Sequence, residues 1–261
     1  MDPSPKHVLV GIYDPGKVVF LVYARTKNVP GAFGDITSRF GQAGLNILSI
    51  SNYSEPGKKE SILGLFAEPT DNRMSAEDVA AALTESRFVL DTYVKKNESG
   101  FAVDDFGFPL NYFPGGRGVL FPQTGLASMF QDILTLYGSG GEAILYRAGH
   151  AVGRQGTDEL AKLFGEDNML EASTSFMKLY NALGWGQLEV EEVSSDFATW
   201  TLALSQSFEC TGLKKPKPQA HFTRGLIVGS AERLLGRQMK CEEVKCVATG
   251  QAYCSFKLYP A

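Results

Sequence analysis

Hydrophobic positions in the first hundred residues alternate between the period of a strand and that of a helix. Residues 17–26 form a β-rich run, which Pro30 and Gly31 interrupt. A helix is predicted next, because apolar residues recur at spacings of three and four: Phe33, Ile36, Phe40 and Ala43. Two strands, a second helix and a last strand follow at residues 46–55, 59–68, 75–85 and 87–95. The first half therefore predicts the order β-α-β-β-α-β.

The second half begins with helical periodicity and ends with strands. Helices are predicted over residues 126–137, 141–165 and 167–184, followed by strands over 185–194 and 196–210. A further helix runs from the proline-rich segment at 215–218 to Gly236, with Gly225 and Gly229 forming a small-residue stripe suited to close packing. Two last strands, residues 237–248 and 251–258, meet across a turn at Thr249-Gly250. The pattern predicts an α/β (α+β) protein whose second half combines helices with an antiparallel sheet.

Composition and charge narrow the class of protein. The chain has 261 residues, 44% of them apolar and 21% charged, with a net charge of -4. This balance argues against a general nucleic-acid binder and against binding to an anionic membrane surface. The first residues lack the pattern of a signal peptide, and no apolar run is long enough for a membrane helix. We therefore expect a cytoplasmic protein, in which clustered cysteines are more often metal ligands or core residues than disulfides.

Cysteines gather near the end of the chain. Cys241, Cys246 and Cys254 fall within fourteen residues, with Glu243 among them. The predicted hairpin brings Cys246 and Cys254 together, and two thiolates with one carboxylate suit zinc, which accepts sulfur and oxygen ligands in a tetrahedral shell. The residues alone leave three alternatives open: a structural zinc site, a group of buried apolar thiols, or a disulfide between Cys246 and Cys254.

The stretch NVPGAFGDITSRFGQAGLNILSI, residues 28–50, resembles the ACT domain, a ferredoxin-like regulatory module that binds amino acids and related ligands. The resemblance assigns residues 1–95 to such a domain and residues 96–116 to a linker. It implies a homodimer and a ligand held across the subunit interface by Asn28 and Asn46, beside Pro30 and Gly31. Both asparagines also have structural explanations, Asn28 as a turn residue and Asn46 as a cap at the start of a strand.

Residues 117–261 resemble the 4-vinyl reductase domain. Four stretches carry the resemblance: AILYRAGHAVGR, SFE, GLIVGSAERLLGR and CEEVKCVATGQAYCSFKL. It implies a mixed α/β fold related to small subunits of a vesicle-tethering complex, and a pocket for a small hydrophobic or aromatic molecule. Trp185, Trp200, Phe176 and Tyr180 are candidate lining residues.

The same resemblance implies a structural zinc held by Glu243, Cys246 and Cys254. The family's fourth ligand is a cysteine, but its position here falls on Ala220. We expect the adjacent His221 to replace it, with Cys210 or Cys241 as alternatives. Without a replacement the shell would be incomplete, because structural zinc is almost always four-coordinate.

These features favour a ligand-binding regulatory protein over an enzyme. The sequence has no Ser-His-Asp arrangement, nucleophile elbow or dinucleotide fingerprint. It also shows no basic DNA-binding helix pair, so its output would pass through an unidentified protein partner. The alternative, suggested by the name of the second domain, is an enzyme or accessory protein of tetrapyrrole metabolism. That alternative ranks second because reducing a vinyl group requires a hydride source, and the sequence has no nicotinamide or flavin fingerprint.

Overall fold

The computed structural model describes residues 7–8, 10–55, 57–113, 116–195 and 198–261. The chain divides into two compact units, Met1–Val119 and Leu120–Ala261. Each unit is described by itself. The whole is a mixed α/β protein with antiparallel sheets, as the sequence predicts.

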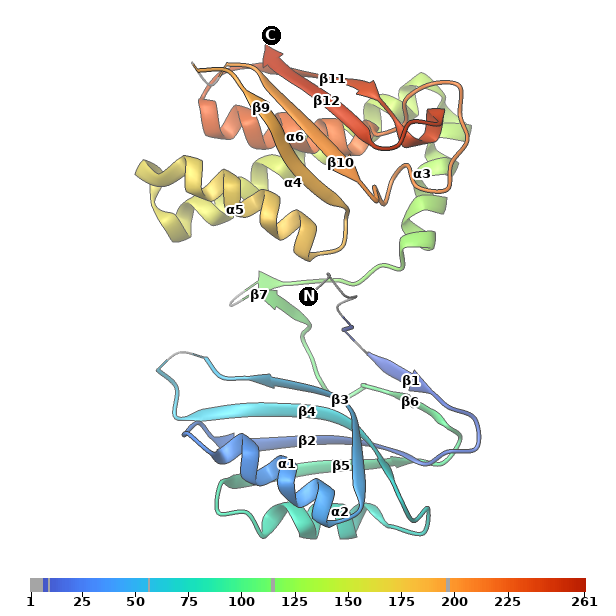
Figure 1. Cartoon of the computed structure of the whole chain (residues 1–261), viewed down its shortest axis with the longest axis vertical. Coiled ribbons are helices and arrows are strands. Elements are labelled where there is room, and N and C mark those ends of the chain that lie inside the picture. Colours follow the sequence, from blue (N-terminus) through green and yellow to red (C-terminus); the bar gives the residue numbers. More distant parts are fainter. Residues whose placement is uncertain (1–6, 9, 56, 114–115, 196–197) are drawn as a thin grey trace. The chain divides into compact units, whose positions relative to one another are not determined.

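A four-stranded antiparallel sheet with the order β3-β4-β2-β5 forms the first unit. Its elements are β2 (Val19–Lys27), α1 (Ala32–Gln42), β3 (Leu45–Tyr53), β4 (Glu60–Pro69), α2 (Ala76–Thr84) and β5 (Val89–Asn97). Both helices cover one face of the sheet (Figure 1). Phe20, Ile36 and Phe40 are buried between these layers. The order β-α-β-β-α-β agrees with the periodicity, because alternate residues of β2 and every third or fourth residue of α1 meet in this core.

The segment predicted as a linker contains paired strands. β6 (Phe101–Val103) pairs with β1 (Gly11–Tyr13), and β7 (Asn111–Phe113) pairs with β8 (Gly116–Arg117). Ala102 is fully buried and packs with Val19 and Leu21 on the sheet face opposite the helices. Residues 114–115 of the predicted linker lie outside the described residues. The compact unit thus extends beyond the predicted boundary at residue 95, because Ala102 of β6 packs on the second face of the sheet.

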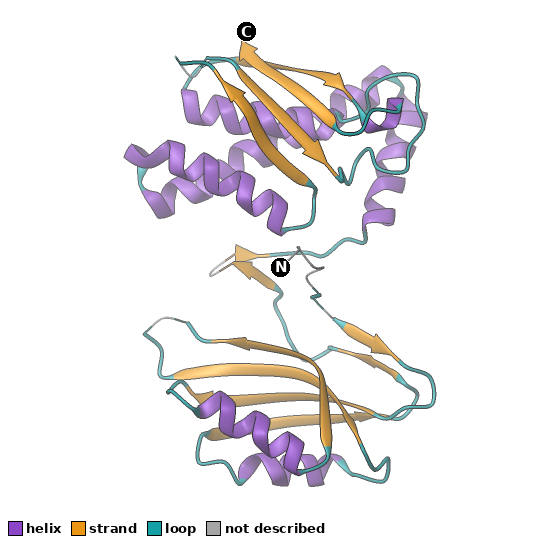
Figure 2. Ribbon diagram, in the orientation of Figure 1, coloured by secondary structure: helices purple, strands orange, loops and turns teal. Residues whose placement is uncertain are grey.

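The second unit packs helices against one face of a second antiparallel sheet with the order β11-β12-β10-β9 (Figure 2). Its helices are α3 (Gln123–Tyr137), α4 (Ser139–Phe164), α5 (Met169–Ala182) and α6 (His221–Leu235). Its strands are β9 (Gln187–Val193), β10 (Trp200–Ser205), β11 (Met239–Lys245) and β12 (Cys254–Pro260). No helix among the described residues is long and apolar enough to span a membrane.

β10 is shorter than the strand predicted over residues 196–210. The first two of those residues lie outside the described part of the chain. At the other end the strand stops at Ser205, because Gln206 has a φ of 53° and turns the backbone out of the sheet. The hydroxyl of Ser207 then accepts a hydrogen bond from the backbone N–H of Cys210 at 3.3 Å. Cys210 therefore lies in a compact turn and not on the strand.

Helices α4 and α6 touch through their backbones. A Cβ atom added at Gly225 would lie 1.9 Å from the carbonyl oxygen of Tyr146, and one at Gly229 would lie 2.0 Å from that of His150. Two glycines of α4, Gly149 and Gly153, face α6 in the same way. The predicted stripe on α6 thus has a matching stripe on α4, and only glycine lets the two helices approach this closely.

Candidate metal centre and apolar cavity

Four side chains of the second unit converge on one point. The sulfur atoms of Cys210, Cys246 and Cys254 and a carboxylate oxygen of Glu243 all lie within 4.8 Å of one another. Cys210 comes from the turn after β10, and Cys254 opens β12, where it pairs with Leu204 of β10. The register of β11 shifts between Glu243 and Lys245; the strand ends at Lys245, and a 3-10 turn at Val247–Thr249 carries the chain toward β12. Strand register and two turns thus build the group.

This group fits a four-coordinate zinc ion. Zinc–sulfur bonds of about 2.3 Å in a tetrahedral shell place sulfur atoms about 3.8 Å apart, and the sulfurs of Cys210 and Cys246 are 3.7 Å apart. All three cysteines of the group are buried. Glu243 accepts a hydrogen bond from the backbone N–H of Ala220 through Oε2, at 2.8 Å. Its other oxygen, Oε1, is buried and has no partner among the described residues, which leaves it available to a cation.

The pKa shifts of the buried thiols and of Glu243 also indicate that this group suits a cation. Hydrogen bonds with Cys210 and Cys254 lower the pKa of the Cys246 thiol, while hydrogen bonds with its neighbours raise the pKa of Cys210. Burial, followed by the contact with Cys246, raises the pKa of the Glu243 carboxyl to about 8. The thiols and the carboxyl thus compete for protons in one buried group. A divalent cation can replace such protons, because thiolates and carboxylates are the ligand forms.

The structure separates the three candidates for the fourth ligand. Cys210 is in the group, whereas His221, the replacement expected from the sequence, is not. The ring Nδ1 of His221 lies 3.2 Å from a guanidinium nitrogen of Arg224. Cys241 is buried outside the group, and Ala220 contributes only its backbone N–H. His221 begins α6 and lies beside Arg224, one turn along that helix, whereas the turn after β10 brings Cys210 to the other ligands.

Next to Cys210 lies a buried carboxylate to which the sequence analysis assigned no role. Glu209 accepts hydrogen bonds from the backbone N–H groups of Phe222 and Thr223 and from the Thr223 hydroxyl, at 2.8, 2.9 and 2.9 Å. These N–H groups belong to the first turn of α6, which has no capping side chain of its own. Burial raises the pKa of Glu209 to about 7. Glu209 thus caps α6, and the short SFEC stretch both caps the helix and delivers Cys210.

An apolar cavity lies between α5, α6 and the sheet. The space in it that a water-sized sphere can reach is about 40 Å³, and the cavity is partly open to solvent. Its lining residues are Ser173, Phe176, Met177, Tyr180, Leu188, Trp200, Leu202, Leu226, Ile227, Ser230, Ala231, Leu234, Leu235 and Leu258. Phe176, Tyr180 and Trp200 were candidates from the sequence. Trp185 instead packs in an aromatic cluster with Tyr180, Phe208 and Phe222.

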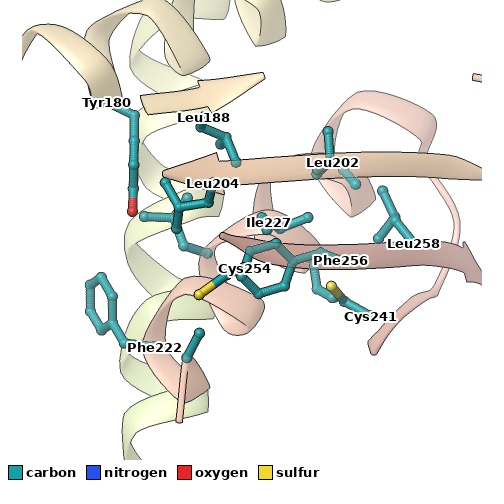
Figure 3. Packing of buried hydrophobic residues seen from close by; sticks show 14 of the residues in the cluster. Tyr180, Leu188, Leu202, Leu204, Phe222, Ile227, Cys241, Cys254, Phe256 and Leu258 are labelled. Atoms are coloured by element: carbon teal, nitrogen blue, oxygen red, sulfur yellow. The ribbon is translucent and has the colours of Figure 1, made fainter. Parts of the chain in front are cut away.

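Strand β12 joins the group of Cys210, Glu243, Cys246 and Cys254 to the apolar cavity. Cys254, Phe256 and Leu258 project from this strand on the same face, and Figure 3 shows them in sequence. Cys254 belongs to the cysteine group and Leu258 to the cavity wall. Four residues of a strand span about 13 Å. The two features therefore share one structural element without sharing side chains.

A second, polar cavity, in which a water-sized sphere can reach about 50 Å³, lies in the first unit at the start of α1. Asn28 lines it together with Lys27, Asn52 and Ser54. Gly31 has a φ of 85° and precedes α1, so it supplies the tight turn that the sequence suggested. Asn46 does not line this cavity, and its side chain donates to Glu68 at 2.9 Å. Asn46 and Asn52 are six residues apart on β3, which is about 20 Å.

Comparison with known proteins assigns the chain to a protein family. A family model for the 4-vinyl reductase domain matches residues 200–260, the segment that holds β10, α6, β11, β12 and the cysteine group. An uncharacterized protein from Methanocaldococcus jannaschii is 31% identical over 150 residues, which cover 56% of this chain and 82% of that protein. The chain therefore belongs to the family of this archaeal protein and contains a 4-vinyl reductase domain. This confirms the 4-vinyl reductase resemblance for residues 200–260, whereas the ACT resemblance of residues 1–95 stays a prediction.

Two solved structures are similar to the chain at low identity. One is the phenol-responsive sensory domain of the transcription activator PoxR with phenol, with a TM-score of 0.46, 16% identity and coverage of 62% of this chain and 81% of that one. The other is a vinyl-4-reductase family protein from Methanocaldococcus jannaschii, with a TM-score of 0.39, 19% identity and coverage of 55% and 84%.

Proposed function

We propose that the chain is a ligand-binding regulatory protein whose second unit encloses a small hydrophobic or aromatic molecule. The observation that carries this proposal is the apolar cavity between α5, α6 and the sheet. Its walls are aliphatic and aromatic, with two serines and no charged side chain among the described residues. Concave, mostly apolar sites with few polar groups are typical of small-molecule binding sites.

In this proposal, a zinc ion held by Cys210, Glu243, Cys246 and Cys254 has a structural role. Four protein ligands fill a tetrahedral shell and leave no position at which water could be activated. The ion would tie the turn after β10 to both ends of the 246–254 connection. It would also fix the start of β12, whose far end lines the cavity.

Binding of naphthalene tests the proposed cavity. Naphthalene should raise the melting temperature of the full chain, because a ligand that binds only the folded state stabilises it by mass action. Ala231 lines the cavity from α6, so Ala231→Phe should fill the space and abolish the shift. The control is Leu136→Phe, at an exposed position of α3, which should leave the shift intact. An equal shift in Ala231→Phe would place binding elsewhere, and no shift in the wild type would remove the support for this function.

For the first unit we propose an ACT-type site for an amino acid or a similar anion at the polar cavity beside Asn28. The free N–H groups at the start of α1 suit a carboxylate. Because Asn46 lies far from this cavity within one chain, its participation requires a second copy, in keeping with a homodimer. The edge strand β3 offers unpaired backbone groups for such pairing. Because the sequence shows no basic DNA-binding helix pair, we expect any regulatory output to pass through an unidentified protein partner.

A screen of the twenty amino acids tests this second site. One of them should raise the melting temperature of the wild type, and Asn28→Ala should remove that shift. If Asn46→Ala removes it as well, light scattering should show a dimer. The matched control is Asn72→Ala, at an exposed turn position outside the cavity. A shift that survives Asn28→Ala, or no response to any amino acid, would contradict the proposed site.

A further inference from the structure

The apolar cavity contains one hydroxyl group that the protein does not satisfy. Ser173 is 6% exposed, and its Oγ is buried without a hydrogen-bond partner among the described residues. Serine within a helix commonly donates to the carbonyl four residues earlier, but that bond is not formed here. An unsatisfied buried hydroxyl is costly, so its presence needs an explanation.

Ser173 lies on the cavity-facing side of α5. Ser173, Phe176, Met177 and Tyr180 follow the spacing i, i+3, i+4, i+7, and all four line the cavity. The serine thus occupies a position where the other members of the stripe are apolar or aromatic. Its hydroxyl is the polar group that α5 adds to this wall, apart from the Tyr180 hydroxyl, which donates to the Trp185 carbonyl at 3.4 Å.

The second serine of the cavity, Ser230 on α6, makes a hydrogen bond whose direction can be assigned. Its Oγ lies 2.8 Å from the Oγ of Thr157, and the Thr157 hydroxyl donates to the carbonyl oxygen of Gly153 at 3.0 Å. A hydroxyl carries a single hydrogen, so Thr157 can only accept from Ser230. Ser230 has then used its hydrogen but keeps lone pairs. The cavity therefore offers one pure acceptor at Ser230 and one free donor and acceptor at Ser173.

From this pairing we infer that the ligand is an uncharged, largely apolar molecule with a hydroxyl group, which accepts from Ser173 and donates to Ser230. The inference rests on the proposed ligand-binding function of the same cavity. A hydroxyl combines donor and acceptor in one uncharged group, so its chemistry suits the free hydroxyl of Ser173 and the acceptor at Ser230. A carboxylate or an ammonium would enter a cavity without a countercharge among the described lining residues, and burying an unpaired charge is strongly unfavourable. Ser173 is thus a specificity-determining residue.

Three probes of one shape separate these requirements: naphthalene, 2-naphthol and 2-naphthoate, each titrated calorimetrically into the full chain. The wild type should bind 2-naphthol roughly tenfold more tightly than naphthalene, the factor expected when hydrogen bonds to buried groups are gained. It should bind 2-naphthoate more weakly than either. Ser173→Ala should reduce the affinity for 2-naphthol roughly fivefold to tenfold and leave that for naphthalene unchanged. Ser128→Ala, at an exposed position of α3, should change neither.

If Ser173 had only a structural role, Ser173→Ala would lower the melting temperature of the protein without ligand. Because its hydroxyl is unsatisfied, Ser173→Ala should not lower the melting temperature of the free protein, although it weakens 2-naphthol binding. Equal affinities for naphthalene and 2-naphthol, or an unchanged ratio in Ser173→Ala, would overturn the inference and leave the proposed function standing. Tight binding of 2-naphthoate would overturn the uncharged requirement. If none of the three probes binds, the proposed function fails and the inference fails with it.

Discussion

Cys246→Ser should release a bound zinc ion and destabilise the second unit. Serine keeps the shape of the side chain but loses the thiolate, which is the form that zinc binds. The shell would be reduced to Cys210, Glu243 and Cys254. If free zinc is a thousand times its dissociation constant, losing the ion costs about 4 kcal/mol of unfolding free energy. The measurement is zinc per chain by atomic emission, after purification without added metal or a histidine tag, together with denaturant unfolding.

Cys241→Ser provides the matched control for this experiment. Cys241 is buried like the ligands but lies outside their group, so the substitution also introduces a hydroxyl into the core. It should keep one zinc per chain, and its loss of stability should be smaller than that of Cys246→Ser. Cys210→Ser should behave like Cys246→Ser, whereas His221→Ala should retain the ion. Zinc near zero in the wild type, with Cys246→Ser and Cys241→Ser equally stable, would show that the cysteines are core residues only.

Gly229→Ala should be among the most destabilising single substitutions in the chain. The new Cβ would lie 2.0 Å from the backbone oxygen of His150, so α4 and α6 would have to separate along their contact. Overpacking of this kind costs about 3 kcal/mol or more when the obstructing atom is backbone. It outweighs the gain of about 1 kcal/mol that alanine brings over glycine inside a helix. Denaturant unfolding followed by tryptophan fluorescence reports on this unit, because both tryptophans, Trp185 and Trp200, lie in it.

Gly125→Ala is the control for the helix contact. Gly125 lies near the start of α3, and a Cβ added there would meet nothing within 4 Å. This substitution should raise the free energy of unfolding by about 0.5 kcal/mol through helix propensity alone. If Gly229→Ala stabilises the protein as Gly125→Ala does, α4 and α6 do not meet through their backbones.

Periodicity predicted the elements that bury a single face, such as α1; β2, which is buried on both faces, and α6, which is buried almost all round, were recognised from their β-rich composition and their helix boundaries. The order β-α-β-β-α-β, the amphipathic helices and the close-packing stripe at Gly225 and Gly229 follow from spacing along the chain. The partner stripe at Gly149 and Gly153 was not predicted, since which helix faces α6 is decided by the tertiary fold. The strand pair β1–β6 was missed because its residues are few and its cover of the sheet depends on contacts distant in sequence.

The candidate site was only partly predictable for a related reason. Glu243, Cys246 and Cys254 are local in sequence, and hairpin geometry brings two of them together. Cys210 reaches them only because the backbone reverses at Gln206 and because β10 pairs with β12. Spacing along the chain does not encode that register. Ser173 could not be singled out either, because an isolated serine in an amphipathic helix is usually exposed, and its burial without a partner is visible only in the structure.

The glycine contact between α4 and α6 has a consequence for how a molecule could reach the apolar cavity. Helices α4 and α6 are in backbone contact, and Glu209 caps α6. We therefore expect these two helices not to separate when a ligand enters. The sheet wall is fixed by its hydrogen-bonded ladder. The remaining wall is α5, which contributes Ser173, Phe176, Met177 and Tyr180. We therefore expect α5 to act as the gate of the cavity, with entry and release of a ligand timed by its outward motion, and its amide hydrogens to exchange faster than those of α4 and α6.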